Sequence, residues 1–268
     1  MKDSKVGERT RRFLWRCRDC NQQYTVRIGT VYEETRLDLR HWCYVFWIAS
    51  TSKKGVSALE LKRHCQINYR SALFLMSRIR FTMAPDVLEP KLTGAVECDK
   101  TYVGGRPRHK GVSRRGRGTK KTPVLAAVQR DGKIRRRVVA DVTGETLKAA
   151  IREEVDSHAR IVTDENSAYR GIGLEYAGGH ESVCRSAREY ARGDVHTNTA
   201  ESSFALVKRG IMGIFHNVSR EHLHRYLWRF DFLWNHRKLN DGERTVLAIR
   251  QSEGRRLMYK SPSDLTTR

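Results

Sequence analysis

The order of predicted elements after residue 91 restricts the fold more than any other feature of this chain. Apolar runs bounded by turn residues predict four strands, and helical spacing of apolar residues predicts a helix before the last strand. The predicted ranges are 94–103, 122–129 and 134–142 for strands, 144–155 for the helix and 159–163 for the final strand. Asp131-Gly132 is a typical hairpin turn. This order predicts an α/β fold in which helices cover a mixed sheet.

Two further helices are predicted after this sheet. One begins near Asn198, and the other runs from about Ser219 with an apolar stripe along one side. The stripe consists of Leu223, Tyr226, Leu227, Phe230 and Trp234. Residues 241–268 lack a comparable stripe, and we expect them to form a C-terminal tail.

The region before the sheet begins with a loose alternation at 21–30, which indicates short strands, and its helical periodicity starts at Asp38. Asp38 is a candidate N-cap for a first helix, and Ser57 to Glu60 resembles a capping box at the start of a short second helix. A third helix is predicted at 69–81, with Ala72, Leu73, Met76 and Ile79 inside and Arg70, Arg78 and Arg80 outside. Two short helices with a basic second helix are typical of a DNA-binding helix-turn-helix, and an ordinary helical hairpin explains them equally well.

The charge of the chain narrows the class of partner. It has 52 Lys and Arg against 30 Asp and Glu, a formal net charge of +22. Such an excess indicates a polyanionic partner, because basic side chains that meet phosphates release condensed counterions. A ribosome-associated or merely soluble basic protein is the alternative. No apolar run approaches the roughly 20 residues of a membrane span, so we expect a cytoplasmic protein without a membrane partner.

A glycine-rich basic loop is predicted at 104–121, between the first two strands. It has eight Lys or Arg residues and no acid, so it cannot bury itself in a core. The loop is either simply solvated or an arm that becomes ordered on DNA phosphates.

Three acidic residues stand out in this basic chain. Asp99 lies in the middle of the first predicted strand, Asp164 follows a buried strand, and Glu201 lies in the first turn of a helix. Lys208 is two turns after Glu201, on the same helix face. Each acid also has a structural explanation. Asp99 is then an outward residue of an edge strand, and Asp164 caps the next turn. Glu201 is then the last residue of a capping box that Asn198 opens.

Taken together, the three carboxylates predict phosphodiester chemistry. Mg²⁺ prefers oxygen ligands, usually carboxylates with water and substrate phosphate. Two such ions roughly 4 Å apart activate the attacking oxygen and stabilise the leaving oxygen. We therefore expect Asp99, Asp164 and Glu201 to bind two Mg²⁺ or Mn²⁺ ions, with Lys208 as a positive charge for phosphate, although simple solvation also explains the lysine.

Several ordered blocks resemble the DDE-type transposases of bacterial insertion sequences, in their zinc-ribbon-bearing ISXO-like branch. Four of the blocks start with Val96-Glu-Cys-Asp99, Val162-Thr-Asp164, His196-Thr-Asn-Thr-Ala-Glu201 and Gly213-Ile-Phe-His216. The fifth block is Phe232-Leu-Trp-Asn235-His-Arg237. The resemblance runs from about Trp15 to Arg237 and implies an RNase H-like fold. It also matches Asp99, Asp164 and Glu201 to the metal-binding carboxylates and Lys208 to the trailing lysine, with Asn198 as a reserve site residue.

The resemblance implies a reaction and partners. The reaction is metal-dependent cleavage at the ends of the element, which exposes a 3′-hydroxyl, followed by attack of that hydroxyl on target DNA. The partners are therefore the terminal repeats and the target DNA on the bacterial nucleoid, and a homodimer or larger assembly is expected because two ends are held together. A non-catalytic DNA-binding relic and a cellular RNase H-like nuclease or resolvase are the alternatives.

The zinc ribbon of this branch has two cysteine pairs, and this chain departs from it. Of the two ribbon pairs, this chain has only the pair Cys17 and Cys20, whereas a structural zinc site needs four ligands. We therefore expect the second half of a ribbon and no complete zinc site. The resulting domain prediction is a ribbon remnant at 1–36, a helix-turn-helix-like region and linker at 37–90, an RNase H-like catalytic domain at 91–240 and a tail at 241–268.

Four residues near these blocks receive structural interpretations. His196 and His216 are expected to be hydrogen-bonded residues at helix ends, although either one close to the site would position phosphate. Glu97 shares a strand face with Asp99, so it is either a support of the metal site or, as the preferred interpretation, a member of a surface ion pair. Tyr102 is expected to pack against the core.

Overall fold

The computed structural model describes residues 2–3, 14–86, 88–104, 121–189 and 191–257. Most of the predicted basic loop therefore lies outside the described residues. Among the helices that are described, none is long and apolar enough to cross a membrane.

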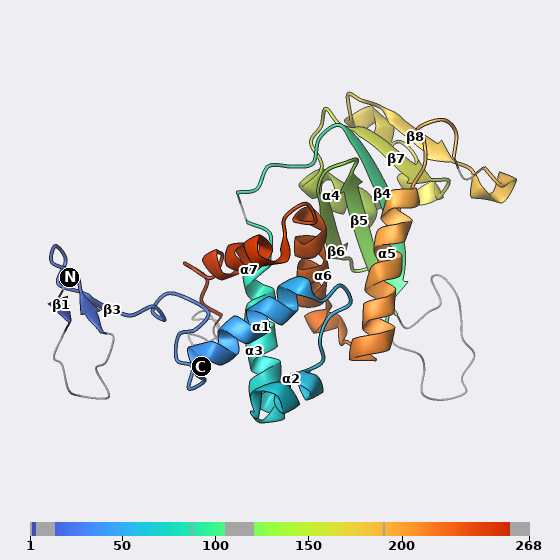
Figure 1. The fold of residues 1–268 in the computed structure, drawn as a ribbon. Helices are drawn as coiled ribbons and strands as arrows, with labels where there is room; N and C mark the ends of the chain where they lie inside the picture. The colour runs from blue at the N-terminus through green and yellow to red at the C-terminus, as the bar shows by residue number, and fades with distance from the viewer. Residues whose placement is uncertain (1, 4–13, 87, 105–120, 190, 258–268) are drawn as a thin grey trace, which may run out of the picture.

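A five-stranded mixed sheet forms the centre of the C-terminal part (Figure 1). Its strands are β4 (Ala95–Val103), β5 (Thr122–Gln129), β6 (Ile134–Val138), β7 (Arg160–Asp164) and β8 (His180–Val183). Their spatial order is β6-β5-β4-β7-β8, with antiparallel pairing through β4, β5 and β6 and parallel pairing of β4, β7 and β8. The predicted α/β, RNase H-like mixed sheet is confirmed. The third strand is shorter than predicted, and β8 was not predicted.

Helices cover both faces of the sheet (Figure 1). On one face α4 (Gly144–Glu154) buries Leu147 and Ile151 against Val96 and Cys98 of β4. On the other face, α5 (Asn198–Gly210) and α6 (Arg220–Asn235) pack on β5 and β6. Short helical turns at Ser167–Tyr169, Ile172–Glu175 and Arg185–Ala187 follow β7 and β8, and a π-helical turn, Ile211–Phe215, continues α5. The alternation of β4 side chains thus sends every second residue, Asp99 included, to the α5 face.

A second core lies in the helical part. It joins α1 (Leu39–Thr51), α2 (Ala58–Cys65), α3 (Tyr69–Thr82) and α7 (Asp241–Arg250) with the end of α6. Ser57 accepts a hydrogen bond from the Glu60 N–H, which confirms the predicted start of α2. The prediction of a tail from residue 241 is wrong at its start, because Ala248 of α7 is fully buried and α7 packs on α1. A small sheet of β1 (Lys2–Asp3), β2 (Trp15–Arg16) and β3 (Gln23–Tyr24) lies apart from this core (Figure 1).

The predicted inside and outside of α3 need correction. Leu73 is 36% exposed, whereas Arg78 and Arg80 are buried. Arg78 donates to the carbonyls of Val31 and Glu33, and the Arg80 guanidinium lies 3.7 Å from the ring centre of Tyr226. These arginines are buried because backbone carbonyls and an aromatic face replace water around their charge.

Other arginines satisfy the carbonyl groups at the ends of helices. Arg229 donates to Ala49 and Ser52, and Arg244 donates to Ser50, all at the C-terminal end of α1. Arg255 donates to Phe81, Thr82 and Ala84 at the end of α3. Cations are favourable there because the last carbonyls of a helix lack partners and carry partial negative charge. Some of the basic residues therefore stabilise the fold by donating hydrogen bonds to the carbonyl groups at helix ends.

The end of α5 contacts the loop between α1 and α2 closely. A Cβ atom added at Gly210 would lie 2.6 Å from Phe230 Cζ and 2.7 Å from the Lys54 carbonyl oxygen. We expect Gly210→Ala to lower the free energy of unfolding by about 1–3 kcal/mol, because a backbone oxygen cannot move aside easily. Urea unfolding measures this. Gly213→Ala is the control, since nothing lies within 4 Å of its added Cβ; equal losses for both variants would contradict the expected clash.

Candidate active site

The pairing of β4 with β7 brings Asp99 and Asp164 to neighbouring positions. The observed register pairs Ala95 with Arg160 and Glu97 with Val162. Continuing this register by two residues places Asp99 beside Asp164, at the last residue of β7. Adjacent strands lie about 4.8 Å apart, so carboxylates on the same face of such a pair share one space. Asp99 is 7% exposed, because α5 covers this face of the sheet.

Local hydrogen bonds hold the two aspartates. Asp99 Oδ1 accepts from the backbone N–H of Lys100 at 2.7 Å, and Asp164 Oδ1 accepts from the N–H of Asn166 at 3.2 Å. The ammonium group of Lys100 lies 3.3 Å from Asp164 Oδ2 and 4.9 Å from the centre of the Tyr169 ring. A cation therefore already pairs with Asp164, and the sequence analysis did not identify Lys100 as its source.

Helix α5, which packs on β4, carries both Glu201 and Lys208. Glu201 lies in its first turn, as predicted, and Lys208 lies in its last turn. Burial lowers the pKa of Lys208, whereas the carboxylates of Asp99 and Glu201 raise it. Lys208 thus follows Glu201 by two turns on the helix that packs on β4.

Asn198 has a different position from the one that a capping box requires. Thr197 is the N-cap of α5 and makes no side-chain cap hydrogen bond, so Asn198 is the first helical residue and is exposed. The capping-box explanation of Glu201 is therefore wrong. Asn198 stays a predicted reserve residue at the start of the helix that carries Glu201.

The carboxylates suit divalent cations by their chemistry. Among the described residues, no three His, Cys, Asp or Glu side chains are grouped closely enough to hold a metal ion. Asp99 and Asp164 nevertheless offer carboxylate oxygens on adjacent strands, and Glu201 offers a third from the helix over that face. Hard oxygen donors of this kind fit Mg²⁺ and Mn²⁺.

Glu97 is buried, and its interpretation as a surface ion pair is wrong. Its exposed fraction is 0%, and Oε2 accepts from the backbone N–H groups of Thr199 at 3.0 Å and Ala200 at 3.1 Å. Oε1 accepts from the Thr199 hydroxyl at 2.9 Å and from Arg130 Nε at 3.3 Å. Sequence alone did not show this because the partners are about a hundred residues away.

The two histidines and Tyr102 occupy ordinary structural positions. The carbonyl of His196 accepts a hydrogen bond from Arg130, and His196 Nδ1 lies 3.3 Å from Glu97 Oε1. His216 Nδ1 lies 3.2 Å from the Met212 carbonyl, just after the π-helical turn. Tyr102 is partly buried against the core of the α4 face.

Cys17 and Cys20 lie near the turn between β2 and β3. Cys17 is half-buried and Cys20 is exposed. Hydrogen bonds from the backbone of Cys20 and Asp19 lower the pKa of the Cys17 thiol. The absence of a complete zinc site stays a prediction.

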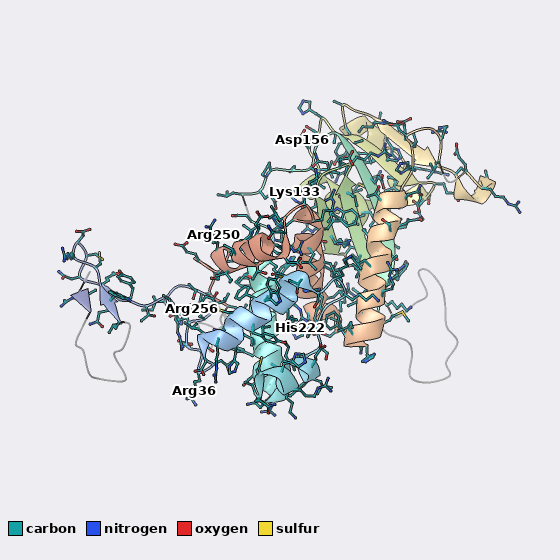
Figure 2. All side chains as sticks on the ribbon, in the orientation of Figure 1. Arg36, Lys133, Asp156, His222, Arg250 and Arg256 are labelled. Atoms are coloured by element: carbon teal, nitrogen blue, oxygen red, sulfur yellow. The ribbon has the colours of Figure 1, made fainter. Side chains whose placement is uncertain are left out.

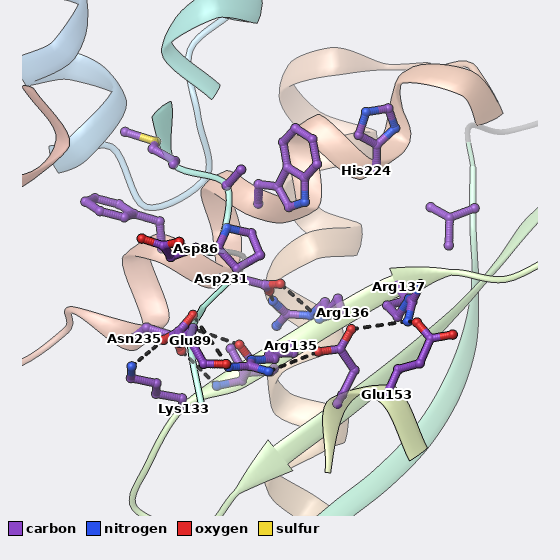
Figure 3. Close-up of a pocket in the computed structure, with 18 of the residues that line it drawn as sticks. Asp86, Glu89, Lys133, Arg135, Arg136, Arg137, Glu153, His224, Asp231 and Asn235 are labelled. Atoms are coloured by element: carbon purple, nitrogen blue, oxygen red, sulfur yellow. Dashed lines mark hydrogen bonds and ion pairs between the residues drawn. The ribbon is translucent and has the colours of Figure 1, made fainter. Parts of the chain in front are cut away.

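A cavity of about 990 Å³ lies elsewhere, between β6, α6 and residues 83–86 and 88–89 (Figure 3). Arg135, Arg136 and Arg137 line it together with Glu89 and Asp231. None of the predicted catalytic residues is among the described residues that line it. Charged side chains are also spread over the whole molecule: Arg36, Arg250 and Arg256 lie in the helical part, and Lys133 and Asp156 lie in the sheet part (Figure 2).

Comparison with known proteins explains this arrangement. The ISXO2-like transposase domain family matches residues 91–235, which include the sheet and the helices α5 and α6. The chain belongs to this family. Its match contains Asp99, Asp164, Glu201 and Lys208, and it confirms the predicted relation to the DDE-type transposases of insertion sequences.

A protein from a transposable element is similar in sequence to most of this chain. It is the "Uncharacterized protein in transposable element ISH50" of Halobacterium salinarum (strain ATCC 700922 / JCM 11081 / NRC-1). The two sequences are 30% identical over 227 residues, which cover 80% of this chain and 76% of the relative. The similarity thus extends beyond the transposase domain.

Proposed function

We propose that this protein cleaves DNA at the ends of its insertion sequence and joins those ends to target DNA. The observation that supports the proposal best is the pairing of β4 with β7, because the same register continued by two residues would bring Asp99 beside Asp164. Glu201 and Lys208 lie on α5, the helix that covers the Asp99 face of β4. Membership of the transposase family supports the same reaction.

Cleavage and joining are two similar phosphoryl transfers. In the first, water attacks the phosphorus at the element end, and the P–O3′ bond breaks to leave a 3′-hydroxyl and a 5′-phosphate. In the second, that hydroxyl attacks a target phosphodiester, and the target's own 3′-oxygen leaves with a proton. The first transfer hydrolyses one phosphodiester bond, and the second exchanges one phosphodiester bond for another. Neither transfer consumes a nucleotide cofactor.

The residues of the chain divide this task. Asp99, Asp164 and Glu201 would hold two Mg²⁺ or Mn²⁺ ions, which stabilise negative charge on the attacking and leaving oxygens when bound. The ammonium group of Lys100 pairs with Asp164 in the structure, so it would have to leave this carboxylate for Asp164 to hold a divalent ion. Lys208 supplies a fixed positive charge for the scissile phosphate, and the buried position of Asp99 limits competition from water.

The partners follow from the reaction. Terminal repeats and target DNA bind to basic side chains, including those of the loop 104–121 and of the helix-turn-helix-like region, through phosphate contacts. We propose a homodimer or larger assembly on DNA, because each reaction joins two element ends to one target. The protein then acts in the cytoplasm, where the nucleoid is accessible.

A combined cleavage and joining assay tests this proposal. Purified protein is incubated with DNA that carries the repeats flanking its own gene, with and without Mg²⁺ or Mn²⁺. We expect metal-dependent nicks at the repeat ends and a joined product. Binding without nicks would identify a non-catalytic relic, and nicks without joined product would identify an RNase H-like nuclease or resolvase.

A further inference from the structure

Helix α5 begins without a cap of its own. Its first N–H groups have no partners within the helix, and the N-cap residue Thr197 makes no side-chain hydrogen bond to them. A helix start that is buried in this way needs acceptors from elsewhere in the chain, because an unpaired buried N–H is costly. Ala200, in the first turn, is fully buried.

The carboxylate of Glu97 supplies those acceptors from the neighbouring strand. Its two oxygens accept from the N–H groups of Thr199 and Ala200 and from the Thr199 hydroxyl, at 2.9–3.1 Å. A negative charge is favourable at this position because the start of a helix carries partial positive charge. The buried charge is also paired with Arg130, so its desolvation is compensated.

The same carboxylate organises the segment that leads into α5. Arg130 contacts Glu97 with Nε and donates to the His196 carbonyl and to Asp194 with its terminal nitrogens. Asp194 in turn pairs with Arg160 at 2.6 Å. Glu97 is therefore the buried centre of a network that joins β4, β5 and β7 to the start of α5.

We propose that Glu97 is a positioning residue for the catalytic centre. It is two residues from Asp99 on the same strand face, and its partner Ala200 directly precedes Glu201. The carboxylate thus connects the strand that carries one proposed metal ligand to the helix turn that carries another. It sets the position of Glu201 relative to Asp99 without contacting the reacting atoms, since protein donors already occupy both of its oxygens.

This inference rests on the proposed function, and two separate measurements test it. The first is hydrogen exchange at the Thr199 and Ala200 amides, which needs no activity. Glu97→Gln replaces one acceptor by a donor, so we expect both amides to exchange roughly tenfold faster. The second is Mn²⁺ binding to the protein alone, followed by electron paramagnetic resonance, for which we expect roughly tenfold weaker affinity.

Thr143→Ala is the matched control. Thr143 caps α4 on the other face of the sheet by accepting from the Thr146 N–H. We expect this variant to loosen the start of α4 and to bind Mn²⁺ like the natural protein. A similar loss of Mn²⁺ affinity in both variants would show that general destabilisation, and not the position of α5, causes the effect.

The outcomes separate the two proposals. Unchanged exchange at Thr199 and Ala200 in Glu97→Gln, or faster exchange with unchanged Mn²⁺ affinity, overturns the positioning role. Failure of the natural protein to bind Mn²⁺ or to cut DNA counts against the proposed function, while the exchange result still decides whether Glu97 holds α5. If Glu97→Gln does not fold, Thr199→Val removes only the hydroxyl contact, and we expect smaller changes in the same direction.

Discussion

Asp99→Asn is expected to reduce metal-dependent DNA cleavage by at least about 10³-fold. Asp99 lies in the middle of β4, which pairs with the strand that ends at Asp164, and the substitution removes its charge with almost no change in volume. Loss of a metal-binding carboxylate removes several kcal/mol of transition-state stabilisation, which corresponds to this factor. Rates of nicking on labelled repeat-end DNA, measured at several Mg²⁺ and Mn²⁺ concentrations, give the result.

The same variant is expected to bind DNA like the natural protein. Phosphate contacts are made by basic side chains, and Asp99 is buried under α5. Asp131→Asn is the control, since this residue lies in the β5–β6 turn with a φ of 54°, a backbone conformation that Asn also tolerates. Cleavage that persists in Asp99→Asn, or is equally lost in Asp131→Asn, would remove Asp99 from the proposed site.

Asp231→Ala is expected to lower the free energy of unfolding by about 3–5 kcal/mol, because it leaves a buried guanidinium without its anion. Asp231 on α6 accepts from the backbone N–H of Arg136 at 2.9 Å and pairs with the Arg136 side chain (Figure 3). Arg136 is 6% exposed and Asp231 is 7% exposed. Burial raises the pKa of Asp231 to about 6, and the guanidinium of Arg136 opposes this shift. Denaturant unfolding followed by circular dichroism measures the loss.

Two further variants define the cause of this loss. Asp241→Ala removes a carboxylate that is 53% exposed and pairs with Arg244, and we expect a change of at most about 1 kcal/mol. Replacing the buried pair together, as Arg136→Met with Asp231→Leu, is expected to recover most of the stability, since no uncompensated charge remains. Equal losses for Asp231→Ala and Asp241→Ala would contradict the proposed importance of burial.

The helices and strands were predictable where local pattern and local partners agree. The second predicted strand, 122–129, matches β5, and the start of α2 matches its capping residues. Helix α7 was missed although its signal is local: Asn240 and Glu243 form a capping box at its start. This pair of residues is visible in the sequence and indicates a helix start at 240, where a tail was predicted instead.

The charge pattern of the sequence did not show which arginines are buried. Arg78, Arg80, Arg136 and Arg229 are buried and bind carbonyls, aromatic rings or a carboxylate. In sequence, nothing distinguishes such an arginine from one that binds DNA, because both are basic residues on a helix or strand. Their partners come from segments far away in the chain, up to 180 residues for Arg229.

The sequence by itself determined the order of the elements from β4 to β7, the blocks that identify the transposase family, and the candidates Asp99, Asp164, Glu201 and Lys208. These depend on residue type and spacing, which a linear chain displays directly. Only the tertiary structure decided that β4, which carries Asp99, pairs with β7, which ends at Asp164, that Lys100 pairs with Asp164, and that Glu97 accepts hydrogen bonds from the start of α5. Each of these depends on the pairing of segments about 64 to 103 residues apart, and such pairing is set by packing of the whole core and not by local pattern.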